Sequence, residues 1–188
     1  NNIHFLGGYH VDAVIEDYPQ LKISVIPGWQ NRSILNTLLN APLSTTPVLV
    51  SYSDTIFRNK AVDGIVSIEA DIVFGIDTKW KERYGNRPAD DINSAEIIEI
   101  EDASGNTDIV EFTGLITFGK KALQCLKGLD ESRIGSTLVH LIEFLKNQGF
   151  TVCPFDVAGD WAEFNSPKDI ARFILGTKAD TLARLEPL

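Results

Sequence analysis

The chain has 188 residues and a formal net charge of −9, with ordinary hydrophobic (44%) and charged (23%) fractions. This length suits one domain with a sizeable core, and the acidic balance argues against a nucleic-acid surface as the main function. No apolar run approaches the length of a membrane span, and the first residues lack the features of a signal peptide, so we expect no membrane insertion.

Two cysteines, Cys125 and Cys153, occur without metal-type or C-x-x-C spacing. We expect them to be reduced thiols of a cytoplasmic protein, packed as small apolar residues. The chain contains no methionine and begins as though within a strand. We therefore expect either that the sequence is a piece of a longer polypeptide or that it lacks some residues.

The first third of the chain alternates between strand and helix patterns. A strand that runs into a Gly-Gly turn is predicted over 3–9, further strands over 21–26 and 48–52, and helices over 11–18 and 33–40. This order is typical of a doubly wound α/β sheet. The run 48–52 is apolar on both faces, which favours a central, parallel strand.

The remainder of the chain mixes further strands with two long helical patterns. Strands are predicted over 70–76, 95–101, 109–112, 115–118 and 151–157, and helices over 120–127, 137–148 and 168–175. Polar turns between the middle strands indicate an antiparallel extension or a mixed sheet. Residues 176–188 follow as a tail that could lead toward a further domain.

The strand at 48–52 ends on Ser53 and Asp54. In parallel α/β sheets ligands bind beyond the carboxyl ends of the strands, so Asp54 is a candidate metal ligand. The alternative is that Asp54 caps the turn or helix that follows.

A second polar group occurs near the end of the chain, where Trp161, Glu163 and Asn165 alternate with Ala162 and Phe164. In a strand the three would share one face. Glu163 and Asn165 could then share a cation with Asp54, as a magnesium ion on a nucleotide requires. The indole could stack on a ring or cover a substrate. The alternative is an edge strand with an exposed polar face.

A third group is cationic, because Lys79, Arg83 and Arg87 recur at four-residue spacing. Arginine binds a phosphate or phosphonate through two parallel hydrogen bonds, so an anionic substrate would be held well here. A solvated helix face explains the same pattern.

Several segments together resemble the nucleotidyltransferases that join CTP or another NTP to sugar phosphates, phosphocholine or phosphonates. The resemblance runs from about residue 3 to 175, and its closing segment, 159–170, is fairly specific. The segments that carry it are Gly7-Gly-Tyr-His-Val-Asp-Ala-Val-Ile15, Ser51-Tyr-Ser-Asp-Thr-Ile-Phe57, Asp77-Thr-Lys-Trp-Lys-Glu-Arg-Tyr-Gly-Asn-Arg87, Glu111-Phe-Thr-Gly114 and Gly159-Asp-Trp-Ala-Glu-Phe-Asn-Ser-Pro-Lys-Asp-Ile170.

The resemblance implies an α/β, Rossmann-like three-layer sandwich over 1–175, with a mixed, mostly parallel central sheet. It implies a Mg²⁺-dependent transfer with release of pyrophosphate, with CTP and a small phosphate or phosphonate compound as partners. Asp54 and Glu163 would be catalytic and would hold Mg²⁺ with Asn165. The remaining implied site residues are Arg83, Arg87, Glu111 and Trp161 toward the substrate, and Gly8, Thr37 and Ser53 toward the nucleotide.

One departure from the family is large. The family opens with a Gly-rich loop, L-A-A-G-x-G-x-R-L, and a P-K lysine that cradle the triphosphate, and neither occurs in this sequence. Two other interpretations therefore stay open. The chain could be a glycosyltransferase of similar fold that uses a nucleotide-sugar, or a non-catalytic binding domain. Under every interpretation, including the nucleotidyltransferase, the chain could form a homodimer or be fused to another domain.

Overall fold

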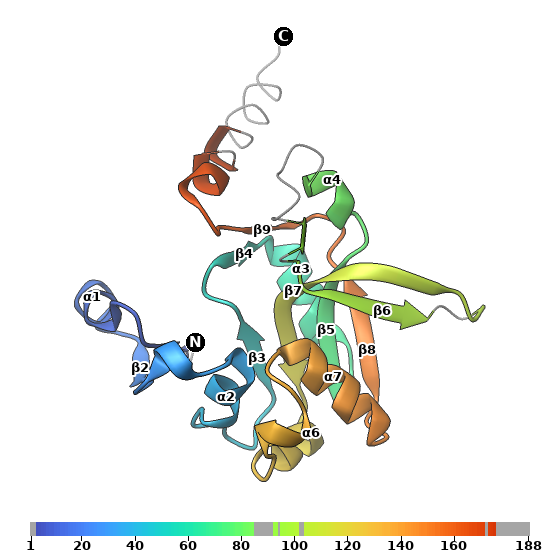
Figure 1. Cartoon of the computed structure of the whole chain (residues 1–188), viewed down its shortest axis with the longest axis horizontal. Helices are drawn as coiled ribbons and strands as arrows, with labels where there is room; N and C mark the ends of the chain where they lie inside the picture. The colour runs from blue at the N-terminus through green and yellow to red at the C-terminus, as the bar shows by residue number, and fades with distance from the viewer. Residues whose placement is uncertain (1–2, 85–91, 94, 102–103, 172, 176–188) are drawn as a thin grey trace.

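The computed structural model describes residues 3–84, 92–93, 95–101, 104–171 and 173–175 (Figure 1). Its strands are β1 (His4–Gly7), β2 (Lys22–Val25), β3 (Val48–Ser51), β4 (Thr55–Phe57), β5 (Ile72–Asp77), β6 (Ile97–Glu101), β7 (Thr107–Phe118), β8 (Val152–Asp156) and β9 (Trp161–Glu163). Its helices are α1 (Val11–Asp17), α2 (Ile34–Leu39), α3 (Asn59–Ser67), α4 (Trp80–Tyr84), α6 (Lys120–Leu126) and α7 (Leu138–Asn147), with short 3₁₀ turns η1 (Trp29–Asn31) and η2 (Glu131–Arg133). The expected α/β class is confirmed.

The central sheet is mixed, as expected. Its strand order is β3-β7-β5-β8, and β6 also pairs with β7. Strand β7 is antiparallel to β3, β5 and β6, whereas β5 and β8 are parallel. Four of these five strands therefore point the same way, and β7 runs against them. Every residue of β5 is buried, because β7 and β8 flank it and helices cover both faces.

The expectation that 48–52 forms a central, parallel strand is wrong. Strand β3 lies at the end of the described sheet and pairs antiparallel with β7. Val48 and Val50 pack against the core, whereas Leu49 is 37% exposed. This short apolar run therefore forms an edge strand. Its inner face packs against the core, and Leu49 on its outer face stays largely outside it.

The two strands expected at 109–112 and 115–118 are one continuous strand, β7. Gly114 sits inside it with a φ of 75°, which a glycine adopts without strain. Opposite this position the register with β5 shifts between Phe74 and Ile76, and Gly75 lies at the irregularity. The Thr-Gly pair thus bends the strand rather than ending it.

The sheet has a helical layer on each face, which gives the expected three layers. Helices α2, α6 and α7 pack on one face through side chains such as Leu35, Leu123 and Leu141. Helix α3 packs on the other face, where Ile65 contacts Val73 and its neighbours. Figure 1 shows α7 lying in front of the sheet, with α6 below it.

Local signals explain the helix boundaries that were predicted. Thr137 caps α7 by accepting a hydrogen bond from the main-chain N–H of His140, and the His140 side chain returns to Thr137. Ser33 caps α2 by accepting from the N–H of Asn36. Gly149, at a φ of 81°, follows the end of α7.

Strands β1 and β2 form a separate, two-stranded parallel sheet connected through α1. In Figure 1 this unit lies beside β3, toward the N-terminal end of the chain. A second small sheet joins β4 and β9, two strands far apart in the sequence. None of the described helices is long and apolar enough to span a bilayer. The tail at 176–188 lies outside the described residues.

Candidate functional site

The pairing of β4 with β9 brings Asp54 close to Glu163. These strands are antiparallel, with Thr55 opposite Glu163. The main-chain N–H of Phe164 extends the ladder by donating to the carbonyl oxygen of Asp54, at 2.9 Å. The two segments that the sequence marked as carboxylate-bearing strand ends are therefore neighbours in space.

The oxygen donors at this junction are accessible to a ligand. Asp54 lies in an exposed turn, Glu163 is half-buried on β9, and Asn165 is exposed two residues later. No cluster of three His, Cys, Asp or Glu side chains able to hold a metal occurs among the described residues. Two carboxylates fit Mg²⁺ nonetheless, because this ion commonly takes one or two from the protein and completes its shell with phosphate oxygens and water.

Tyr52 lies at the centre of the acidic groups around this turn. Its hydroxyl donates a hydrogen bond of 2.7 Å to Oε2 of Glu96. Burial raises the pKa of the Tyr52 hydroxyl above its ordinary value, and the charge of Glu96 raises it further. The carboxylates of Asp54 and Glu163 add smaller contributions in the same direction to this pKa. Tyr52 is therefore a hydrogen-bond donor at any physiological pH.

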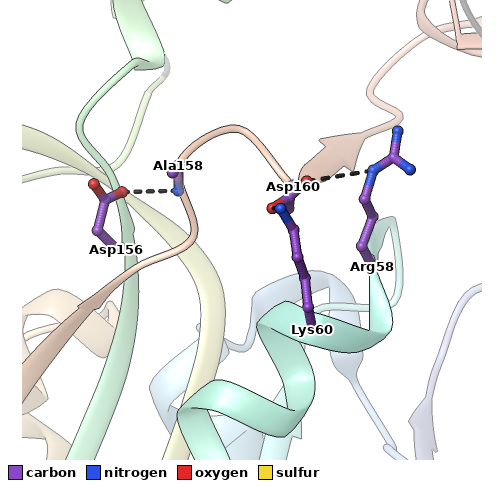
Figure 2. Close-up of polar contacts among 5 residues, drawn as sticks. All are labelled: Arg58, Lys60, Asp156, Ala158 and Asp160. Carbon is purple, nitrogen blue, oxygen red and sulfur yellow. Dashed lines mark hydrogen bonds and ion pairs between the residues drawn. The ribbon is translucent and has the colours of Figure 1, made fainter. Parts of the chain in front are cut away.

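The turn that leads from β8 to β9 is fixed at its start by Asp156. Oδ1 of Asp156 accepts from the N–H of Ala158 at 2.8 Å (Figure 2), and Oδ2 accepts from the Thr78 hydroxyl at 2.7 Å. Ala158 and Gly159 have φ values of 50° and 84°, so the chain reverses sharply here. The turn is thereby tied to the end of β5.

The same turn is fixed at its other end by Asp160. Figure 2 shows its carboxylate between two cations from the start of α3, Arg58 (Nε to Oδ1, 3.3 Å) and Lys60. The N–H of Arg58 also donates to the Asp160 carbonyl oxygen at 2.9 Å. Because both ends of the turn are held, β9 starts at a defined place beside β4.

Trp161 is buried at the start of β9. Its ring is stacked on Phe57, with centroids 6.1 Å apart and an interplanar angle of 11°. Its Nε1 donates to Oδ2 of Asp77 at 2.8 Å, and the N–H of Lys79 donates to Oδ1 of the same carboxylate. Through these contacts Trp161 packs in the interior and joins β9 to the end of β5. The expected role of Trp161 toward a substrate stays a prediction.

Glu111 is buried on β7, opposite Asp77 in the register of β5 with β7. Its Oε1 accepts a hydrogen bond of 2.6 Å from the hydroxyl of Tyr84 on α4. Arg83 also lies on α4, but its side chain and the whole of Arg87 lie outside the described residues. The substrate roles of all three stay predictions.

The three residues expected on the nucleotide side lie on different elements. Ser53 shares the exposed turn of Asp54. Gly8 follows β1 and lies under the Trp29 ring, where a Cβ atom would come within 2.2 Å of Cγ. The hydroxyl of Thr37 on α2 donates to the carbonyl of Ser33. No contact among the described residues joins Gly8 or Thr37 to Asp54.

No protein-family model matches the sequence, and no curated protein matches it either. Solved structures do match, each at 13–16% identity. The inositol-1-phosphate CTP transferase from T. maritima matches with a TM-score of 0.60, over 88% of this chain and 71% of its own. The proposed glucose-1-phosphate thymidylyltransferase from Bacillus anthracis, in complex with a sucrose, gives 0.64 over 99% and 77%. HddC from Yersinia pseudotuberculosis gives 0.58 over 90% and 76%.

The chain has the nucleotide-diphospho-sugar transferase fold. The match to the thymidylyltransferase structure extends over nearly the whole chain, including the small β1–β2 and β4–β9 sheets. At these identities the structural similarity shows the fold alone, because one fold can host several activities.

Sequence reasoning missed three residues of the candidate site: Tyr52, Asp77 and Glu96. Asp77 carries the same signal as Asp54, a carboxylate at the end of a buried strand, and could have been found in that way. Tyr52 precedes Asp54 by two residues and could have been noted for its position. Glu96 has no sequence signal, since only the tertiary fold brings it to Tyr52.

Proposed function

We propose that the chain is a Mg²⁺-dependent nucleotidyltransferase domain that joins an NTP to a small phosphate or phosphonate compound and releases pyrophosphate. The observation that carries this proposal is the β4–β9 register, in which Thr55 lies opposite Glu163 and the N–H of Phe164 donates to the carbonyl oxygen of Asp54. Both carboxylates also act on the hydroxyl of Tyr52, whose pKa each of them raises. Two carboxylates from separate strand ends, one of them in an exposed turn, are suited to a metal that also binds nucleotide phosphates.

The reaction needs no protein nucleophile. An oxygen of the acceptor phosphate or phosphonate attacks the α-phosphorus of the NTP in line, a new P–O bond forms, and the bond to the β-phosphate oxygen breaks. Pyrophosphate leaves with that oxygen. Bound Mg²⁺ would supply neutralisation of the negative charge on the reacting phosphates. Asp54, Glu163 and Asn165 would hold it, so these side chains act by position and charge.

CTP is the first candidate nucleotide. Two features support it: the resemblance of segments 77–87 and 111–114 to the phosphonate and phosphocholine branch, and a fold neighbour whose name is a CTP transferase. Arg83, Arg87 and Glu111 are the proposed acceptor-side residues in this scheme. Gly8, Thr37 and Ser53 are the proposed nucleotide-side residues, with Thr37 near the base.

The test is pyrophosphate release from each of the four NTPs, with phosphocholine or aminoethylphosphonate as acceptor, with and without Mg²⁺. The proposal predicts release that requires both the acceptor and the metal, fastest with CTP. The variant Asp54→Ala should abolish release, since a ligand of the metal that neutralises the reacting phosphates is lost. Asp63→Ala removes another exposed carboxylate, on α3, and should leave the rate unchanged.

Three outcomes would contradict the proposal. Unchanged release by Asp54→Ala would exclude the metal assignment. Transfer from a UDP-sugar without activity on CTP would favour a glycosyltransferase. Mg²⁺-dependent CTP binding without any pyrophosphate release would favour a non-catalytic binding domain.

A further inference from the structure

The turn that carries Asp54 is connected to the central sheet through the main chain of Tyr52. The N–H of Tyr52 donates to the carbonyl oxygen of Gly114 on β7, at 3.1 Å. The carbonyl oxygen of Tyr52 accepts from the Thr55 hydroxyl at 2.9 Å, which closes the turn. Asp54 therefore projects from a short segment whose two ends are both hydrogen-bonded.

The side chain of Tyr52 fixes the same segment a second time. Its ring lies directly on Gly114, where a Cβ atom would come within 2.5 Å of Cδ2. The edge of this ring also meets Phe112, with centroids 6.0 Å apart. Beyond the ring, the hydroxyl reaches Oε2 of Glu96 at 2.7 Å. This last contact is the only polar one that the Tyr52 side chain makes within the described residues.

Glu96 is itself held in place by β7. Its carbonyl oxygen accepts from the N–H of Phe112 at 2.7 Å, immediately before β6 begins. Glu96 is partly buried, and the charged or titratable groups that face it are Tyr52, Asp54 and His140. The acceptor of the tyrosine hydroxyl is thus a group that the central sheet positions.

We propose that the hydrogen bond from Tyr52 to Glu96 is a positioning contact for the Asp54 carboxylate, which fixes the turn in the conformation that binds a divalent cation. This inference rests on the proposed metal site. It assigns a role to two residues that do not touch the cation. Without the bond, the ring of Tyr52 would stay packed on Gly114, but the turn would lose its link to Glu96 and would hold Asp54 less firmly.

A purely electrostatic role for Glu96 gives the opposite pattern of effects. If the carboxylate acted by adding negative charge near Asp54, then removing that charge would weaken cation binding, whatever became of the hydrogen bond. Tyr52→Phe removes the donor and keeps every charge. Glu96→Gln removes the charge and keeps an oxygen that can accept from Tyr52. The two variants therefore separate position from charge.

The experiment is a titration of the full chain with Mn²⁺, a paramagnetic substitute for Mg²⁺, in which free Mn²⁺ is counted by electron paramagnetic resonance. Tyr52→Phe should weaken binding about three- to tenfold, the effect of one lost hydrogen bond. Glu96→Gln should bind within about twofold of the wild type, and Glu96→Ala should weaken binding as Tyr52→Phe does.

A matched control is available on the other face of β7, where Tyr84 donates to Glu111. Tyr84→Phe loses the same phenolic hydroxyl from a buried tyrosine and should not change Mn²⁺ affinity. Thermal unfolding of each variant checks that all of them fold.

The inference is overturned if Tyr52→Phe binds Mn²⁺ as tightly as the wild type does, or if Glu96→Gln is weakened while Tyr52→Phe is not. Either result would leave the proposed function standing, since the wild type would still bind the cation. A wild type that binds no Mn²⁺, alone or with CTP, would overturn the proposed metal site and this inference together.

Discussion

Trp161 Nε1 donates a 2.8 Å hydrogen bond to Oδ2 of Asp77, and this bond joins the strand that carries Glu163 to the end of the fully buried strand β5. Asp77 is inaccessible to solvent. Its carboxylate therefore depends on protein donors, and the indole N–H of Trp161 is one of them.

Replacing Trp161 with phenylalanine should destabilise the protein. The variant keeps an aromatic ring against Phe57 but leaves Oδ2 of Asp77 without the indole donor. We expect a loss of about 1–3 kcal/mol in the free energy of unfolding, which lowers Tm by roughly 2–4 °C per kcal/mol for a chain of this size. Calorimetry measures it, with Trp29→Phe as the control, because Trp29 is 38% exposed. Equal losses in both variants would contradict the account.

Substituting alanine at three glycines should separate backbone strain from steric clash. Gly114 combines a φ of 75° with the Tyr52 ring at 2.5 Å from the added Cβ atom. Gly149 has a φ of 81° but open space, and Gly128 has open space without a positive φ. We expect Gly114→Ala to be the most destabilising, Gly149→Ala intermediate at about 1 kcal/mol, and Gly128→Ala within about 0.5 kcal/mol of the wild type.

Denaturant titrations of the three variants give this order directly. A Gly114→Ala protein no less stable than Gly149→Ala would mean that Tyr52 does not pack on Gly114 as described.

Asp71 should make stability depend on pH in the acid range. The main-chain N–H of Thr151 donates to its Oδ2 at 2.9 Å, and Lys121 lies 3.2 Å from the same oxygen. The hydrogen bond from Thr151, and then Lys121, hold the pKa of Asp71 below its ordinary value. A carboxyl whose pKa is lower in the folded state stabilises the protein above its unfolded pKa. That contribution is lost as pH falls through the folded value.

The variant Asp71→Asn should therefore have a lower Tm than the wild type at pH 7, and the difference should shrink below about pH 4. Melting curves across this range measure it. A difference in Tm that stays constant from pH 7 to pH 3 would show that the ionised carboxylate contributes nothing.

Much of the site was predictable because strand ends carry its chemistry. Asp54 follows an apolar strand, and Glu163 alternates with apolar residues, so both were candidates before their contact was known. Their pairing depends on β4, which has only three residues and gives too short a pattern to recognise. The position of Glu96 beside Tyr52 depends wholly on long-range packing.

Helix α3 was not predicted from the sequence, and this too has a physical reason. It contains Asp63-Gly64, a dipeptide typical of turns. In the folded chain Gly64 is needed for packing, since a Cβ atom there would come within 2.4 Å of the Phe155 ring. For the same reason β7 was predicted as two strands that end on either side of Thr113-Gly114. In the folded chain Gly114 makes room for the ring of Tyr52. In both places a glycine that looks like a turn signal serves a close contact with an aromatic ring.

The most direct test of the account is a double-mutant cycle on cation affinity with Asp54→Asn and Glu163→Gln, measured by Mn²⁺ titration in the presence of CTP. If both carboxylates hold the same ion, each single variant should weaken binding about tenfold or more, and the two effects should not be additive. Affinities unchanged from the wild type, or effects that simply add, would show that Asp54 and Glu163 do not share a cation.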